Sequence, residues 1–101
     1  MYAMNQHGFA RDDDFKVIEN THNSVAFELA STEESKEIFP FDYKLQVEYT
    51  LVKKSLKIEY TVINPSKNND LYFAIGAHPA FNCPFETGHN RDEYQLVFDK
   101  K

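Results

Sequence analysis

The sequence predicts an all-β protein whose antiparallel strands build a β-sandwich. Two observations support that prediction. Aromatic residues are frequent, with nine Phe and six Tyr against three Gly and no Trp, and such a composition suits half-buried pleated surfaces better than helices. Apolar and polar residues also alternate along two long neighbouring segments, so each of these strands has one buried apolar face and one solvent-exposed polar face.

Length and charge narrow the class of function. The chain has 101 residues, at most one ordinary domain, and a formal net charge of -5, which argues against a nucleic-acid partner. No apolar stretch approaches the roughly 20 residues of a membrane helix, and residues 1–6 do not read as a signal peptide. We therefore expect a cytoplasmic chain without a membrane partner. Cys83 is the single cysteine, so no internal disulfide is expected.

Six segments have the composition and spacing of strands, and turn-forming residues bound them. In chain order they are residues 15–19, 24–30, 43–51, 56–62, 71–78 and 94–98. The first two flank a turn-rich stretch and predict one hairpin. Asp12-Asp13-Asp14, just before them, reads as a solvated acidic turn rather than a cation site, because three consecutive side chains diverge.

Residues 31–37 begin like a helix, since Ser31 or Thr32 can cap it and acidic residues fill its first turn. Pro40 limits that helix to one or two turns. The clearest alternation follows, in two strands joined by a reversal at residues 52–55. Their apolar positions are Tyr43, Leu45, Val47, Tyr49, Leu51, Leu56, Ile58, Tyr60 and Val62. The resulting apolar face is too large to remain uncovered.

The strand expected before His78 places this histidine in a defined setting. Alternate residues of a strand share a face, so the face that carries the His78 imidazole also holds Gly76, Ala74 and Tyr72. The side chains on this face become smaller from Tyr72 to Gly76, which leaves space beside the imidazole. Pro79 adds no ladder donor and keeps the preceding residue extended, so the strand should stop at His78. From these residues alone, a packed histidine at a strand end is favoured over one that contacts a ligand.

Other histidines give weaker candidates. His89 lies six residues after Cys83, which suggests a thiol pair, yet no orienting residue can be named and an ordinary loop is favoured. A zinc site built from His78, Cys83 and His89 lacks a fourth ligand. We therefore expect no metal and no cofactor.

Two motifs, in this order, resemble a known family. They are His7-Gly8-Phe9-Ala10-Arg11 and Gly76-Ala77-His78-Pro79-Ala80-Phe81-Asn82, with Phe39-Pro40-Phe41 before the long hairpin and Asn64-Pro65 after it. Together they are similar to the middle of the aldose 1-epimerase (galactose mutarotase) superfamily. The resemblance is closest to its LacX-like bacterial branch and more distant to the hexose-6-phosphate 1-epimerases. The resemblance runs over nearly the entire chain. Either motif alone is weak, whereas the pair in this order and setting is fairly specific.

The resemblance implies a fold, a reaction and a site. Residues 1–101 would be part of a single galactose mutarotase-like β-sandwich domain whose N- and C-terminal portions are missing. The family interconverts the α and β anomers of an aldose, so the implied partner is a hexose or a hexose phosphate. His78 matches the family's general acid, and His7 matches a second pocket histidine. Arg11 matches an arginine associated with the pocket in the sugar-phosphate branch.

The implied chemistry suits these residue types. Opening a hemiacetal ring requires a proton delivered to the ring oxygen and another removed from the anomeric hydroxyl, and an imidazole exchanges protons near neutral pH. The family's base is a glutamate nearer the C-terminus, outside these residues, and neither Glu86 nor Glu93 can be assigned that role. We expect this chain alone to be inactive and its open sheet edges to favour self-association. A non-catalytic carbohydrate-binding module of the same fold is the main alternative, and a structural piece of a larger carbohydrate enzyme is a third.

Overall fold

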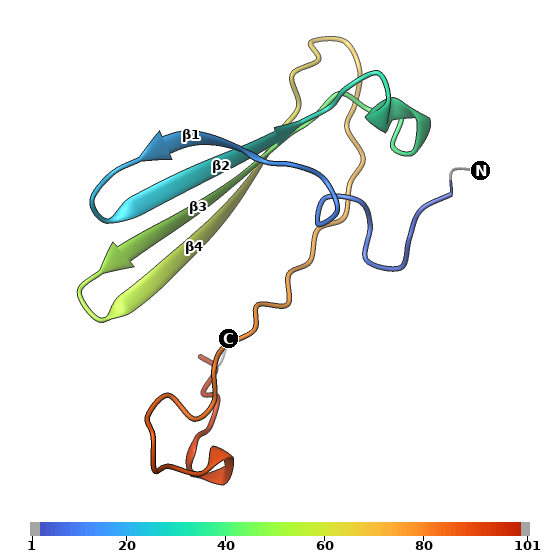
Figure 1. The fold of residues 1–101 in the computed structure, drawn as a ribbon. Coiled ribbons are helices and arrows are strands. Elements are labelled where there is room, and N and C mark those ends of the chain that lie inside the picture. Colours follow the sequence, from blue (N-terminus) through green and yellow to red (C-terminus); the bar gives the residue numbers. More distant parts are fainter. Residues whose placement is uncertain (1–2, 100–101) are drawn as a thin grey trace.

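The computed structural model describes residues 3–99 and contains a sheet of four antiparallel strands in the order β1-β2-β3-β4 (Figure 1). The strands are β1 (Lys16–Asn20), β2 (Ser24–Ala30), β3 (Lys44–Val52) and β4 (Ser55–Ile63). Two short 3-10 helices, η1 (Ser35–Glu37) and η2 (Arg91–Glu93), complete the regular structure. No helix within residues 3–99 is long and apolar enough to cross a membrane.

Each strand pairs with its neighbour in sequence, and short reversals at residues 21–23 and 53–54 join β1 to β2 and β3 to β4. The register of β2 on β3 and of β3 on β4 is unbroken, whereas β1 carries a bulge between Val17 and Glu19. At the tip of the β3–β4 hairpin, Lys53 has a φ of 55°, the left-handed conformation that a two-residue reversal requires. The longer β2–β3 connection holds η1, and the Ser31 N–H closes it by donating to the Tyr43 carbonyl at 3.0 Å.

The register collects the alternating apolar residues on one face of the sheet. Three rows cross β2, β3 and β4: Leu29, Leu45 and Val62; Phe27, Val47 and Tyr60; and Val25, Tyr49 and Ile58. The opposite face is polar, and there the Gln46 amide donates to Glu28 at 2.8 Å. The apolar core is small, because its buried members are only Ala26, Leu29, Tyr43 and Val47 among the described residues.

Aromatic rings cover the sheet where β3 begins. Phe9, from the loop that precedes β1, lies with its ring centroid 5.2 Å from that of Phe39 and 5.5 Å from that of Tyr43. The Phe39 ring in turn lies 5.0 Å from the Phe41 ring. Tilted aromatic pairs at these separations are favourable, so the cluster holds the N-terminal loop against the connection that contains η1.

The all-β antiparallel class and four of the six predicted strands are confirmed. The helix predicted from residues 31–37 is confirmed as the single 3-10 turn η1, in which Thr32 and Ser35 exchange side-chain to backbone hydrogen bonds of 2.8 and 3.0 Å. This reciprocal pair is the physical basis of the predicted helix start.

The strands predicted at residues 71–78 and 94–98 are wrong, because both segments are irregular. A strand needs a neighbouring edge as well as an apolar pattern. Leu71, Phe73 and Ile75 instead help to line a hollow over the apolar face, together with Leu45 and Val62 of the sheet. Residues 94–98 belong to the lobe formed by residues 79–99, which extends away from the sheet (Figure 1).

Candidate functional site

His7 projects from a turn that backbone geometry defines. The Gly8 N–H donates to the Asn5 carbonyl at 2.9 Å, and Gly8 has a φ of 70°, which a residue with a side chain adopts only with strain. On the following side, Phe9 is fixed by the aromatic cluster. The His7 imidazole therefore leaves a constrained turn while remaining exposed to water.

His78 reaches the same place from the other end of the chain. Its ring centroid lies 5.3 Å from that of His7, and the two ring planes are inclined by 59°. His78 follows the irregular segment that crosses the apolar face, and its side chain is also exposed. The two histidines singled out by the sequence motifs are therefore neighbours, and both are open to a ligand from solvent.

An apolar hollow of about 250 Å³ is lined by His7 but not by His78, whose ring lies beside the His7 ring. His7 and Gly76 line it, together with Leu45 and Val62 from β3 and β4. A methyl group built on Gly76 would meet no atom within 4 Å, so there is open space at this position. The volume lies just below the roughly 300–1,000 Å³ that small-molecule pockets occupy. The full lining is Met4, His7, Gly8, Phe9, Ala10, Phe39, Tyr43, Leu45, Val62, Leu71, Phe73, Ala74, Ile75 and Gly76.

Arg11 does not line this hollow. Its Nε lies 3.4 Å from Oδ1 of the adjacent Asp12, and both side chains are exposed. The guanidinium thus has a local carboxylate partner, and a role for Arg11 in substrate binding stays a prediction.

The two carboxylates that follow His78 in the sequence are engaged elsewhere. Glu93 Oε2 lies 2.6 Å from His89 Nδ1, and Glu86 Oε2 lies 3.8 Å from His89 Nε2. Both acids therefore belong to the C-terminal lobe around His89. No carboxylate is among the described residues that line the hollow, and no group of three side chains within residues 3–99 could hold a metal ion.

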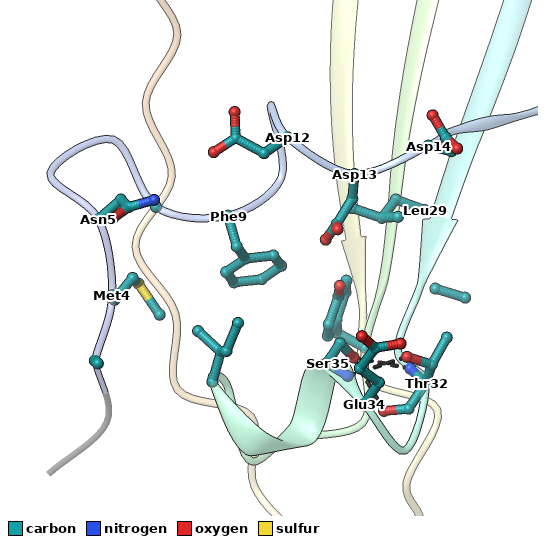
Figure 2. Close-up of a pocket in the computed structure, with 15 residues that line it drawn as sticks. Met4, Asn5, Phe9, Asp12, Asp13, Asp14, Leu29, Thr32, Glu34 and Ser35 are labelled. Carbon is teal, nitrogen blue, oxygen red and sulfur yellow. Dashed lines mark hydrogen bonds between the residues drawn. The ribbon is translucent and has the colours of Figure 1, made fainter.

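A larger cavity of about 580 Å³ lies between the N-terminal loop, the end of β2 and η1 (Figure 2). Figure 2 shows Phe9 pointing into it, and Asp13 also faces inward toward Glu34 and Ser35. Tyr43 forms part of its wall with a buried hydroxyl that has no hydrogen-bond partner within residues 3–99. Burial raises the pKa of Tyr43, the nearby Ser35 side chain opposes that rise, and the Asp13 carboxylate adds to it.

The sequence offered no signal for this second cavity. The Asp12-Asp13-Asp14 run was expected to be a solvated turn, and all three side chains are indeed exposed. What periodicity cannot show is that the loop before β1 folds back over the end of β2, because that contact depends on how Phe9 packs.

The aldose 1-epimerase family profile matches residues 2–100. The chain belongs to the aldose 1-epimerase family. Two relatives, the plasmid and chromosomal LacX proteins of Lactococcus lactis subsp. lactis, are each 37% identical to it over 95 residues. The match covers 94% of this chain and 32% of each relative, so this aldose 1-epimerase family member spans about a third of their length.

Solved structures agree with this assignment. A galactose mutarotase related enzyme from Lactobacillus acidophilus matches with a TM-score of 0.62 and 38% identity, over 64% of this chain and 22% of that one. A galactose mutarotase-like protein from Lactobacillus casei matches with a TM-score of 0.59 and 44% identity, over 62% of this chain and 21% of that one. The expected galactose mutarotase-like fold and the LacX-like relationship are therefore confirmed.

Proposed function

We propose that residues 1–101 supply the histidine-bearing part of an aldose 1-epimerase site that interconverts the α and β anomers of a hexose. The observation that carries the proposal is the approach of His7 and His78 to a ring separation of 5.3 Å, with His7 lining an open hollow. On this proposal the chain is part of a single galactose mutarotase-like domain.

Each histidine has a distinct task in this proposal. His78 acts as the general acid that protonates the ring oxygen as the hemiacetal opens, and it takes the proton back on closure. His7 donates or accepts a hydrogen bond with a sugar hydroxyl and so orients the ring. The apolar lining of the hollow, which includes Phe73, contacts the carbon face of the hexose.

The anomeric hydroxyl also needs a proton acceptor. The described residues that line the hollow include no carboxylate, and Glu86 and Glu93 pair with His89 instead. We therefore propose that residues 1–101 bind a hexose without accelerating its mutarotation, and that a longer protein containing them would supply the base.

The missing carboxylate also favours a second candidate function, a non-catalytic carbohydrate-binding module. Both candidates predict binding at the histidine pair, but only the first predicts that a longer protein containing these residues speeds anomer exchange.

Binding can be tested on this chain with histidine ring protons as reporters. Adding glucose or galactose should shift the NMR signals of His7 and His78, while His22 in the β1–β2 turn and His89 in the C-terminal lobe serve as internal controls. His78→Ala should weaken binding at least tenfold, and His22→Ala should leave it unchanged. Equal shifts of all four histidines, or none with hexose far above millimolar concentration, would refute the site.

Catalysis is tested by polarimetry on a longer protein that contains these residues. The relaxation of α-glucose and α-galactose should be faster than in buffer, and His78→Ala should lower the rate about a hundredfold or more, as loss of a positioned acid does. His22→Ala is the matched control. Relaxation no faster than in buffer, with hexose binding retained, would support the binding module instead.

A further inference from the structure

The outer edge of β4 is the longest open edge of the sheet. β4 spans nine residues and pairs with β3 on one side, and no other strand within residues 3–99 pairs with its other side. An edge strand presents a row of unpaired N–H and C=O groups that another strand can bind. The apolar face beside this edge is also open, since Leu56 is 48% and Tyr60 is 43% exposed.

The segment that follows β4 does not cover the edge along residues 55–61. Leu71 and Phe73 lie over the apolar face near Val62, at the far end of β4, where they line the same hollow as His7. Residues 55–61 therefore keep both an unpaired edge and uncovered apolar side chains.

The sequence of β4 is complementary to itself in one antiparallel register. Two sheets join with their apolar faces continuous only when residues of the same face lie opposite each other, so the two-fold axis must pass through a residue. An axis at Ile58 places Lys57 opposite Glu59 of the partner subunit, and the same pair recurs on the other side of the axis. Leu56 then lies opposite the partner subunit's Tyr60, which extends the apolar face across the junction.

The neighbouring registers are less favourable. An axis at Glu59 sets this carboxylate against Glu59 of the partner subunit, and like charges directly opposite are destabilising. An axis at Tyr60 sets Lys57 against the partner subunit's Ile63 and forms no charge pair.

Electrostatics within the chain favour the Ile58 register further. Glu59 lies directly opposite Glu48 across the β3–β4 pair, so two carboxylates are neighbours on the polar face. One cation offsets them, because Lys57 Nζ lies 2.7 Å from Glu59 Oε2. In the proposed register, Lys57 of the partner subunit adds a second cation beside Glu59.

We propose that this chain forms a two-fold dimer in which β4 pairs antiparallel with β4 of a second copy, centred on Ile58. Two sheets of four strands then become one continuous sheet. The proposal is independent of the catalytic assignment, because it rests on an edge that does not include His7 or His78.

Charge reversal in this register gives a specific test by sedimentation equilibrium. The unmodified chain should be a dimer. Lys57→Glu alone and Glu59→Lys alone should each weaken the dimer at least tenfold, because each places like charges opposite each other twice. An equimolar mixture of the two variants should form a one-to-one heterodimer, since every facing pair is then of opposite sign.

The mixture also controls for folding, because unfolded variants could not associate in register. Lys16→Glu, on β1 at the other edge of the sheet, is the matched charge control and should leave the dimer intact. A monomeric unmodified chain, single variants that dimerise normally, or a mixture that stays monomeric would each overturn the proposal. Pairing of residues 71–77 with β4 would give the monomeric result.

Discussion

The imidazole rings of His7 and His78 lie 5.3 Å apart although one precedes the first strand and the other follows the last. Two separate structural features bring the two rings together. The Gly8 turn and the packing of Phe9 fix the first ring, and the passage of residues 71–76 across the apolar face delivers the second. The site therefore depends on packing at the end of the sheet where β3 begins and β4 ends.

This proximity predicts that His7 and His78 act on a bound hexose as a coupled pair. The losses of hexose affinity caused by His7→Ala and by His78→Ala should not add, because both rings contact one ligand and each other, and couplings between contacting residues are about 0.5–3 kcal/mol. NMR titration of both single variants and the double variant measures this coupling. Losses that add to within about 0.3–0.5 kcal/mol would show that the rings act independently.

The four paired strands could be predicted because their residues alternate and their neighbours in sequence are their neighbours in space. The pattern at Leu45, Val47 and Tyr49 specifies both a strand and the face it buries, and a short reversal supplies the next strand. Residues 71–77 carry an equally apolar pattern, yet local sequence does not show whether a neighbouring strand edge is free to pair with them. Leu71 and Phe73 pack over the face of the sheet, and the segment forms no strand despite its strand propensity.

The candidate site was predictable only through the two motifs. Periodicity gave His78 a defined setting and His7 a loop, but it favoured a packed histidine, whereas the structure exposes both rings. The position of Arg11 beside Asp12 could not be predicted, because a guanidinium in a loop can interact with any of several nearby carboxylates or with water. Likewise, the unsatisfied Tyr43 hydroxyl results from packing that alternation alone does not describe.

The Tyr43 hydroxyl is expected to cost stability. Tyr43 is 4% exposed, and its hydroxyl has no partner within residues 3–99. An unsatisfied buried polar group costs about 1–3 kcal/mol, so Tyr43→Phe should leave the free energy of unfolding in urea unchanged or raise it by about that amount. Tyr43→Ala should lower it by about 3–5 kcal/mol, because the contacts with Phe9 and Phe39 are lost.

Tyr60→Phe is the matched control, since Tyr60 is half exposed and its hydroxyl should change the free energy of unfolding little. If Tyr43→Phe lowered that free energy by more than about 1 kcal/mol, the hydroxyl would have to form a hydrogen bond in solution.

The ion pair that closes the β2–β3 connection predicts a specific acid sensitivity. Lys36 Nζ lies 2.9 Å from Asp42 Oδ1, and this hydrogen bond holds the pKa of Asp42 below its ordinary value and raises the pKa of Lys36. A lowered folded-state pKa gives stability that is present above the unfolded-state pKa of about 4 and is lost as the pH falls through the folded-state value. Asp42→Asn should therefore flatten the acid side of the stability profile.

Thermal unfolding of the two proteins at neutral pH and below about pH 4 measures this effect. Asp14→Asn serves as the control, because Asp14 is an exposed aspartate of the N-terminal loop and its replacement should leave the profile unchanged. The same acid-induced decrease in the unmodified chain and in Asp42→Asn would contradict the assignment.

The place of Arg11 predicts that it contributes little to binding of an uncharged hexose. Its guanidinium pairs with Asp12 and lies outside the lining of the hollow, so Arg11→Gln should change glucose affinity less than threefold. His7→Ala, from the same loop, should weaken it at least tenfold and is the matched comparison. A hexose 6-phosphate adds a dianion that an arginine can bind through paired hydrogen bonds. If Arg11→Gln reduced affinity for glucose and for its 6-phosphate equally, the side chain would have to reach the sugar itself, contrary to its position beside Asp12.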